Sequence, residues 1–255
     1  MIMKILSQSR FLSWPVKWGG WIIFCLLVIH SAAIAATPVR KNVSTVKRPG
    51  AQPVLTPSGP ADLNKITCGN WIYAGNKSSV CFADRFLVEV TKETHLDVSR
   101  SFYPVRLDSD TLFDFPFSVF SGEDSFSLTP KERENFRKYL LNGGFIMVSP
   151  GCSDANWDRS FRNEFKICFP DRELVKIPMT HPIFSTVHII PRLSDKTGRI
   201  VQLEGLEVNG KLALVYSKEG LNDVGYAKGC CCCGGNEVRD PVKVNINVIT
   251  YALLY

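Results

Sequence analysis

The sequence lacks the short glycine-rich motifs that hold phosphate groups in nucleotide-binding proteins. Neither G-x-x-x-x-G-K-[ST] nor G-x-G-x-x-G occurs in the 255 residues, so no phosphate-binding loop of either kind is predicted. The chain also lacks an apolar run long enough to span a membrane comfortably. Its apolar stretch at residues 21–29 (WIIFCLLVI) is shorter than the roughly 20 residues that a membrane-spanning helix needs.

This apolar stretch lies in an N-terminal segment with the composition of a secretory signal peptide. The basic residues Lys4, Arg10 and Lys17 precede it, and small residues follow it, ending in an A-x-A cleavage site at Ala33, Ile34 and Ala35. We therefore expect residues 1–35 to direct export and to be cleaved, with retention as a membrane anchor as the alternative. Cys25 follows the bulky Phe24, so lipidation at this cysteine is not expected.

Residues 36–60 have little that could fold. They contain five prolines, four basic residues, no acid and almost no large apolar side chain, so nothing offsets the entropy lost on ordering. We predict a basic, disordered tether here, a solvated linker that could also touch an anionic membrane surface or cell-wall polymer. The formal charge of +6 falls to +3 without residues 1–35 and to −1 without the tether. This near-neutral remainder argues against nucleic-acid binding, which needs positive charge on the fold.

The clearest secondary structure lies in the middle of the chain. The apolar run FPFSVFSG (115–122) predicts a strand buried on both faces. Thr129, Pro130 and Glu132 form the N-terminal signature of a helix that stops at the glycines 143–144. A second buried strand, FIMV (145–148), follows. Strand, helix and strand in this order predict a βαβ unit with parallel strands.

The flanking segments predict further elements of the same fold. Expected strands lie at 71–73, 101–107 and 211–217, and expected helices at 81–94 and 156–169. Pro104 removes a ladder donor, which favours an edge strand, and Asn209-Gly210 favours a hairpin turn before the last strand. The C-terminal VNINVITYALLY fits a helix or a strand. Together the pattern predicts one three-layer α/β domain over residues 61–255, with a mostly parallel sheet.

Ligands of such sheets bind outside the carboxyl ends of the strands. Two such ends carry polar residues, Glu123-Asp124 after the first buried strand and Cys152-Ser153-Asp154 after the second. If the two strands are neighbours, these residues share one binding rim. Glu123 and Asp124 have a simpler alternative role, because acidic residues before a helix interact favourably with its positive end.

Four motifs follow one another in the second half of the chain: YLLNGGF, FPDRELVKIPMTHPIF, NGKLALVYS and NINVITYALLY. In this order they resemble the DUF4159 family of uncharacterised bacterial proteins, over most of residues 61–255. The resemblance implies a flavodoxin-like sheet of the class I glutamine amidotransferase type, and it implies a helix at the C-terminus. It implies no reaction, because the biochemical role of that family is not established.

Cys152 is the candidate nucleophile, with His181 as its candidate base. A catalytic cysteine needs a cation or helix N-terminus to stabilise its thiolate, and a base within hydrogen-bond reach. Cys152 precedes a predicted helix, but the downstream His-x-Glu of amidotransferase-like domains is missing. The elbow pattern G-x-C-x-G is also incomplete, since Asp154 stands where the second glycine is expected.

Eight cysteines remain beyond the predicted signal: Cys68, Cys81, Cys152, Cys168, Cys230, Cys231, Cys232 and Cys233. An even number in an exported protein favours disulfides, and Cys68 with Cys81 could close a loop. Cys152 and Cys168 stand at opposite ends of one predicted helix, roughly 22 Å apart, which is too far for a direct bridge.

The consecutive cysteines at 230–233 cannot all converge on one metal ion. Two of them, together with Cys152 or His181, could hold zinc or copper(I). The resembling family has a cysteine in both regions, and this favours contact between Cys152 and the 230–233 loop as a disulfide, a metal site or a redox pair.

The sequence thus predicts an exported, envelope or periplasmic binding or assembly module without a cofactor. Its expected partners are envelope proteins or cell-wall and glycan material. The alternatives are a cysteine-dependent hydrolase or amidase, and a thiol metal or redox site.

Overall fold

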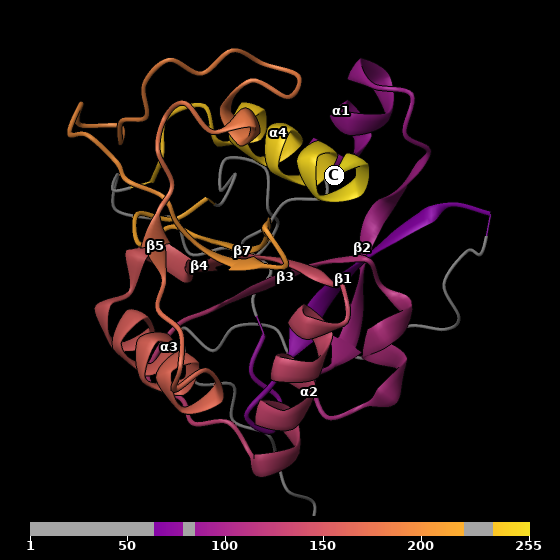
Figure 1. The fold of residues 1–255 in the computed structure, drawn as a ribbon, viewed down its shortest axis with the longest axis vertical. Helices are drawn as coiled ribbons and strands as arrows, with labels where there is room; N and C mark the ends of the chain where they lie inside the picture. The colour runs from indigo at the N-terminus through magenta and orange to yellow at the C-terminus, as the bar shows by residue number, and fades with distance from the viewer. Residues whose placement is uncertain (1–63, 79–84, 222–236) are drawn as a thin grey trace, which may run out of the picture. The chain divides into compact units, whose positions relative to one another are not determined.

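The computed structural model of the chain describes residues 64–78, 85–221 and 237–255. The predicted signal peptide, the tether, Cys81 and the cysteines at 230–233 lie outside the described residues. Within the described ranges, helices cover both faces of a seven-stranded sheet, which confirms the predicted three-layer α/β fold (Figure 1).

The strands are β1 (Ile66–Ile72), β2 (Val98–Arg106), β3 (Phe117–Gly122), β4 (Phe145–Pro150), β5 (Val175–Lys176), β6 (Glu204–Val208) and β7 (Lys211–Tyr216). The α-helices are α1 (Arg85–Glu93), α2 (Pro130–Leu141), α3 (Ala155–Cys168) and α4 (Pro241–Leu254). Three short 3-10 turns are η1 (Asp110–Asp114), η2 (Gly151–Ser153) and η3 (Pro182–Phe184).

The order of the strands across the sheet is β2-β1-β3-β4-β7-β6-β5. The first five are parallel to one another, and their order is that of flavodoxin-like, doubly wound sheets. β6 and β5 continue the sheet in antiparallel pairing. The predicted βαβ unit is present as β3, α2 and β4, and β2 with its Pro104 is an edge strand, as expected.

Local chemistry explains the element boundaries that matter most. The Thr129 side chain accepts a hydrogen bond from the Glu132 amide, and the Glu132 side chain accepts one from the Thr129 amide, a complete capping box for α2. The hairpin between β6 and β7 turns at Asn209 and Gly210, with φ of 53° and 79°. Such positive values suit a two-residue primed turn.

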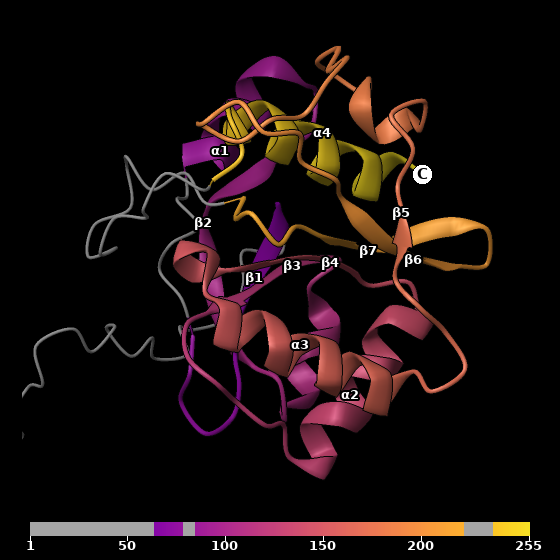
Figure 2. The same ribbon diagram turned by 90° about the vertical axis from the view of Figure 1, so that its left-hand side faces the viewer.

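Helices α1 and α4 lie on one side of the sheet and α2 and α3 on the other (Figure 2), and an apolar layer fills the space on each side. Side chains alternate along the strands, so in β3 Phe117 and Val119 face α1 and α4, while Phe120 faces α2 and α3. The irregular segment 177–203, which the sequence pattern did not predict, packs with α1 and α4 through residues such as Ile183 and Leu193. The C-terminal segment is helix α4, as the family resemblance implied.

None of the helices in the described part of the chain combines the length and apolar character needed to cross a bilayer.

Candidate functional site

The carboxyl ends of β3 and β4 lie side by side, since Gly122 pairs with Pro150 in the sheet. Glu123 therefore lies against Gly151. A Cβ atom at position 151 would stand 3.1 Å from Glu123 Cγ and 3.3 Å from its Oε1. The structure thus brings the two predicted rim segments together, Glu123-Asp124 on one strand end and 151–154 on the next.

Cys152 occupies a sharp, strained turn between β4 and α3. Its φ and ψ are 52° and 28°, and Ser153 follows with φ of 51°. A non-glycine residue in this left-handed region costs about 1–3 kcal/mol. Asp154 then caps α3, because its Oδ1 accepts a hydrogen bond from the Trp157 amide at 2.7 Å. The half-exposed Cys152 thus stands just before the N-terminus of a helix, whereas Asp154 has a structural partner.

The structure does not bring His181 to Cys152. The His181 ring contacts Tyr251 (5.2 Å between ring centroids), and Tyr251 in turn contacts Phe145 (6.4 Å), the first residue of β4. Cys152 lies beyond the other end of that strand, about 20 Å away at roughly 3.3 Å per residue. His181 also accepts a hydrogen bond at Nδ1 from the Ile183 amide at 3.1 Å, and burial lowers its pKa. The predicted Cys152–His181 pair is therefore corrected to two separate residues at opposite ends of the sheet.

The other two described histidines also lie away from Cys152. His188 Nε2 stands 3.0 Å from the carboxylate of Glu93, the last residue of α1. His95 lies in the short connection from α1 to the start of β2. Among the described residues, therefore, no histidine is placed to act as a base for Cys152.

The crevice between β1 and β3, where flavodoxin-like sheets hold ligands, is filled on its α2–α3 side by aromatic side chains. The Tyr73 hydroxyl donates to the Ser121 carbonyl oxygen at 3.2 Å and accepts from Trp157 Nε1 at 2.6 Å. Both rings are fully buried. A Cβ atom at Gly122 would lie only 1.9 Å from Tyr73 Oη. This side of the crevice has no room for a ligand.

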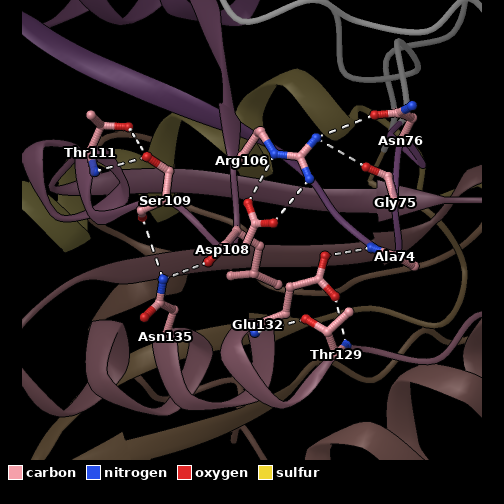
Figure 3. Close-up of polar contacts among 11 residues, drawn as sticks. Ala74, Gly75, Asn76, Arg106, Asp108, Ser109, Thr111, Thr129, Glu132 and Asn135 are labelled. Atoms are coloured by element: carbon pink, nitrogen blue, oxygen red, sulfur yellow. Dashed lines mark hydrogen bonds and ion pairs between the residues drawn. The ribbon is translucent and has the colours of Figure 1, made fainter. Parts of the chain in front are cut away.

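We call the Tyr73 and Trp157 pair the aromatic plug. Polar residues beside it form their hydrogen bonds with one another (Figure 3). The buried Glu132 side chain accepts hydrogen bonds from the amides of Ala74 and Thr129, each at 2.7 Å. Arg106 donates to both carboxylate oxygens of Asp108 at 2.9 and 3.0 Å, and to the Gly75 carbonyl oxygen at 3.2 Å. These contacts fasten the turn after β1 to α2 and to the end of β2, so they are structural.

A row of three serines crosses the carboxyl ends of β3, β4 and β7. Ser121 pairs with Ser149 in the sheet register, and the Ser217 amide donates to the Val148 carbonyl oxygen at 3.0 Å. All three serines have no exposed surface. They point toward α1 and α4, because the residues two positions earlier in each strand belong to that apolar layer.

The segment after β7 completes a polar cluster around these serines. The Leu221 amide donates to Ser149 Oγ at 3.1 Å, and Asn245 Nδ2 of α4 donates to the Leu221 carbonyl oxygen at 2.9 Å. A Cβ atom at Gly220 would lie 3.6 Å from both Ser153 Oγ and Glu237 Cγ. The polar cluster is therefore made of Ser121, Ser149, Ser153, Ser217, Glu237 and Asn245.

Several buried atoms of the polar cluster have no hydrogen-bond partner among the described residues: the hydroxyls of Ser121, Ser153 and Ser217, Glu237 Oε1 and Asn245 Oδ1. Glu237 is fully buried, and Lys196 Nζ lies 3.0 Å from its Oε2 as an ion pair. Buried polar groups normally find a partner in the protein, in ordered water or in a ligand. This concentration at the carboxyl edge of a parallel sheet marks the polar cluster as the candidate site.

Sequence reasoning found only Ser153 of the polar cluster. A usable signal was present, because each of the three strands predicted at 115–122, 145–148 and 211–217 has a serine at or near its end: SVFSG, IMVSP and ALVYS. Glu237 and Asn245 carry no such signal. They reach the cluster only through the packing of α4 and of the segment before it.

The described cysteines are not joined to one another by a disulfide. Cys68 in β1 and Cys168 at the end of α3 are buried, and burial raises the pKa of both thiols, that of Cys168 to about 12. Within the described ranges, no group of three or more histidine, cysteine or acidic side chains could hold a metal ion. The hypotheses that involve Cys81 or the 230–233 cysteines concern residues outside those ranges.

Comparison with known proteins gives one family. The model of the domain of unknown function DUF4159 matches residues 77–253, a span that contains all of the parallel strands except β1. No curated protein matches the chain significantly. Because the matched span covers well over half of the 255 residues, the chain belongs to the DUF4159 family.

Proposed function

We propose that the protein is an exported binding module of the cell envelope that holds a hydrogen-bond-donating ligand at the polar cluster. The observation that carries the proposal is a set of buried oxygens near the ends of β3, β4 and β7, on Ser121, Ser153, Ser217, Glu237 and Asn245, that have no hydrogen-bond partner among the described residues. Glu237 Oε1 and Asn245 Oδ1 are acceptors, and serine hydroxyls can both donate and accept. Such a lining suits a ligand rich in hydroxyl or amino groups, which is the chemistry of glycans and cell-wall material.

One further feature favours binding over catalysis: the described histidines lie away from Cys152. The α2–α3 side of the usual ligand crevice is filled by Tyr73 and Trp157, so a ligand is expected on the other side, where the polar cluster lies. The case for export rests on residues 1–35, whose basic start, apolar stretch and small residues have the composition of a signal peptide.

Substitution of Ser217 tests the binding role. In the absence of ligand, Ser217→Ala removes a buried hydroxyl without a described partner, so the variant should be as stable as the parent or more stable. The affinity of the full-length Ser217→Ala chain for soluble cell-wall fragments is measured by calorimetry. It should fall about tenfold relative to the parent if one hydrogen bond of roughly 1–1.5 kcal/mol is lost.

Ser118→Ala is the matched control. Ser118 is a buried serine of β3 on the opposite face, and its hydroxyl interacts with Tyr139 Oη at 3.2 Å. This variant should lose stability but keep the affinity for ligand. Binding that falls equally in both variants, or a chain that binds none of the fragments, would contradict the proposed site.

A cysteine-dependent hydrolase is the second candidate, favoured by the strained turn that places Cys152 before α3. Two acidic residues flank that turn: Asp154, which caps α3, and Glu123, which lies against Gly151. Thiol trapping with peptide mapping separates the candidates. A Cys152 joined to the 230–233 loop excludes the nucleophile. A fast-reacting thiol, together with a turnover that Cys152→Ala abolishes, would replace the binding module with the hydrolase.

A further inference from the structure

A separate cavity of about 160 Å³ lies at the beginning of α4. Its walls come from two segments, 189–194 and 239–244. The Arg239 amide donates to the Ser194 carbonyl oxygen at 2.8 Å, which holds the two segments together. The cavity is thus formed by backbone that is fixed on both sides, although the segments are far apart in sequence.

Three cationic side chains line this cavity: Arg192, Arg239 and Lys243. All three are exposed, and none forms an ion pair with another described residue. The hydrogen bonds of the two arginines go to carbonyl oxygens instead, from Arg192 to Gly198 and from Arg239 to Lys196, each at 3.4 Å. Asp240 is the one acidic residue of the lining. The lining therefore carries a net charge of two positive.

The first turn of α4 adds to this positive potential. The helix has 14 residues and no acidic residue in its first turn, and its N-cap Asp240 makes no side-chain capping hydrogen bond. The N-terminus of an α-helix carries about half a positive charge. The dipole and the three side chains therefore attract the same kind of ligand, an anion.

The cavity is larger than one small anion needs, and part of its wall is apolar. Its volume of 160 Å³ is close to that of engineered cavities, about 150 Å³, that accommodate benzene. Ile189 in its wall is 85% exposed. Apolar surface is thus available beside the cationic side chains.

We propose that this cavity binds a phosphate group carried on a larger molecule. The guanidinium groups of Arg192 and Arg239 suit bidentate contacts with phosphate oxygens. Lys243 supplies a third charge, and Ile189 contacts the apolar part of the carrier. The site is independent of the polar cluster, and its ligand carries the opposite chemistry, anionic rather than hydrogen-bond-donating.

The test compares two charge-matched double variants of the full chain. Arg192→Gln with Lys243→Gln removes two charges from the cavity. Lys166→Gln with Lys176→Gln removes two exposed charges that form no ion pair among the described residues, from α3 and β5. Binding of inorganic phosphate is measured by calorimetry at constant ionic strength, with chloride as the reference salt. We expect the cavity variant to bind phosphate at least about tenfold more weakly, and the control variant to keep the parent affinity.

A second arm identifies the source of the phosphate. Sedimentation with phosphatidylglycerol–phosphatidylcholine vesicles is compared with sedimentation with phosphatidylcholine alone. If only the cavity variant loses binding to the anionic vesicles, the ligand is a lipid headgroup; if vesicle binding is equal in all three proteins while phosphate binding is lost, the ligand is a soluble phosphate ester. Equal losses of phosphate binding in both variants, or a parent chain that binds phosphate no better than chloride, would overturn the proposal.

Discussion

Replacement of Gly122 by alanine should destabilise the protein through one specific collision. Gly122 ends β3 and has no positive φ that would disfavour alanine. A Cβ atom there would stand 1.9 Å from Tyr73 Oη and 2.8 Å from Trp157 Nε1, so the pair must move apart. Overpacking costs about 1–3 kcal/mol, and a buried indole N–H left without its acceptor costs a further 1–3 kcal/mol or so. We expect the free energy of unfolding to fall by roughly 2–6 kcal/mol.

A double-mutant cycle with Tyr73→Phe isolates this collision. Tyr73→Phe alone removes the acceptor of the Trp157 indole and should cost about 1–3 kcal/mol. In that background Gly122→Ala no longer meets a hydroxyl and has no indole hydrogen bond left to break. The double variant should therefore be more stable than the sum of the single losses predicts, by at least about 1 kcal/mol. Urea unfolding followed by tryptophan fluorescence measures all four proteins.

Tyr139→Phe provides the matched control for this cycle. Tyr139 is also buried, and its hydroxyl donates to the Phe115 carbonyl oxygen at 2.7 Å, near the amino end of β3. Gly122→Ala and Tyr139→Phe should be additive within about 0.5 kcal/mol, because they share no partner. Additivity between Gly122→Ala and Tyr73→Phe as well would refute the reasoning that the aromatic plug fills the crevice.

Two other predictions concern titration and reactivity. Burial alone would raise the pKa of Asp195, but hydrogen bonds from Thr197 and Arg199 outweigh it and lower the pKa from 3.8 to about 2. The stability that the carboxylate contributes is thus present above pH about 4 and is lost as pH falls toward 2. In urea unfolding, the gap between the parent and Asp195→Asn should shrink over that window, and a constant gap would contradict the assignment. In the reduced native chain, iodoacetamide should modify the half-exposed Cys152 well before Cys168, whose pKa is about 12 because of burial. Peptide mapping that finds equal rates would show that Cys168 is not protected.

The fold was predictable wherever local chemistry specifies an element. The capping residues Thr129, Pro130 and Glu132 and the two flanking apolar runs define β3, α2 and β4 without any long-range information. The two-residue strand β5 could not be predicted in this way, because both of its residues are exposed and carry no pattern. β6 was indicated only by the turn at Asn209 and Gly210. Its pairing with β5 depends on the path of the connecting segment 177–203. The sequence of that segment shows no regular helix or strand pattern from which this path could be predicted.

The candidate site was predictable only in part, because its residues meet through pairings distant in sequence. The expectation that Glu123 would lie beside the turn at 151 needed only that β3 and β4 be neighbours, which a βαβ unit favours. The polar cluster also needs β7 next to β4, a pairing across more than sixty residues of chain. His181 was placed with Cys152 on residue type alone. The packing of η3 against the end of α4 puts His181 at the opposite edge of the sheet from Cys152.

The alternation of side chains along β3 gives its last two residues different roles. Ser121 faces α1 and α4 and contributes to the polar cluster, whereas Gly122 faces α2 and α3 and leaves room for the aromatic plug. A ligand at these strand ends must therefore enter from the side of α1 and α4. Substitution of Ser121 by alanine should change ligand affinity with little loss of stability, and substitution of the neighbouring Gly122 should do mainly the reverse. Under the proposed binding role, these two adjacent residues separate binding from folding, because the pleat of the strand points them at opposite layers.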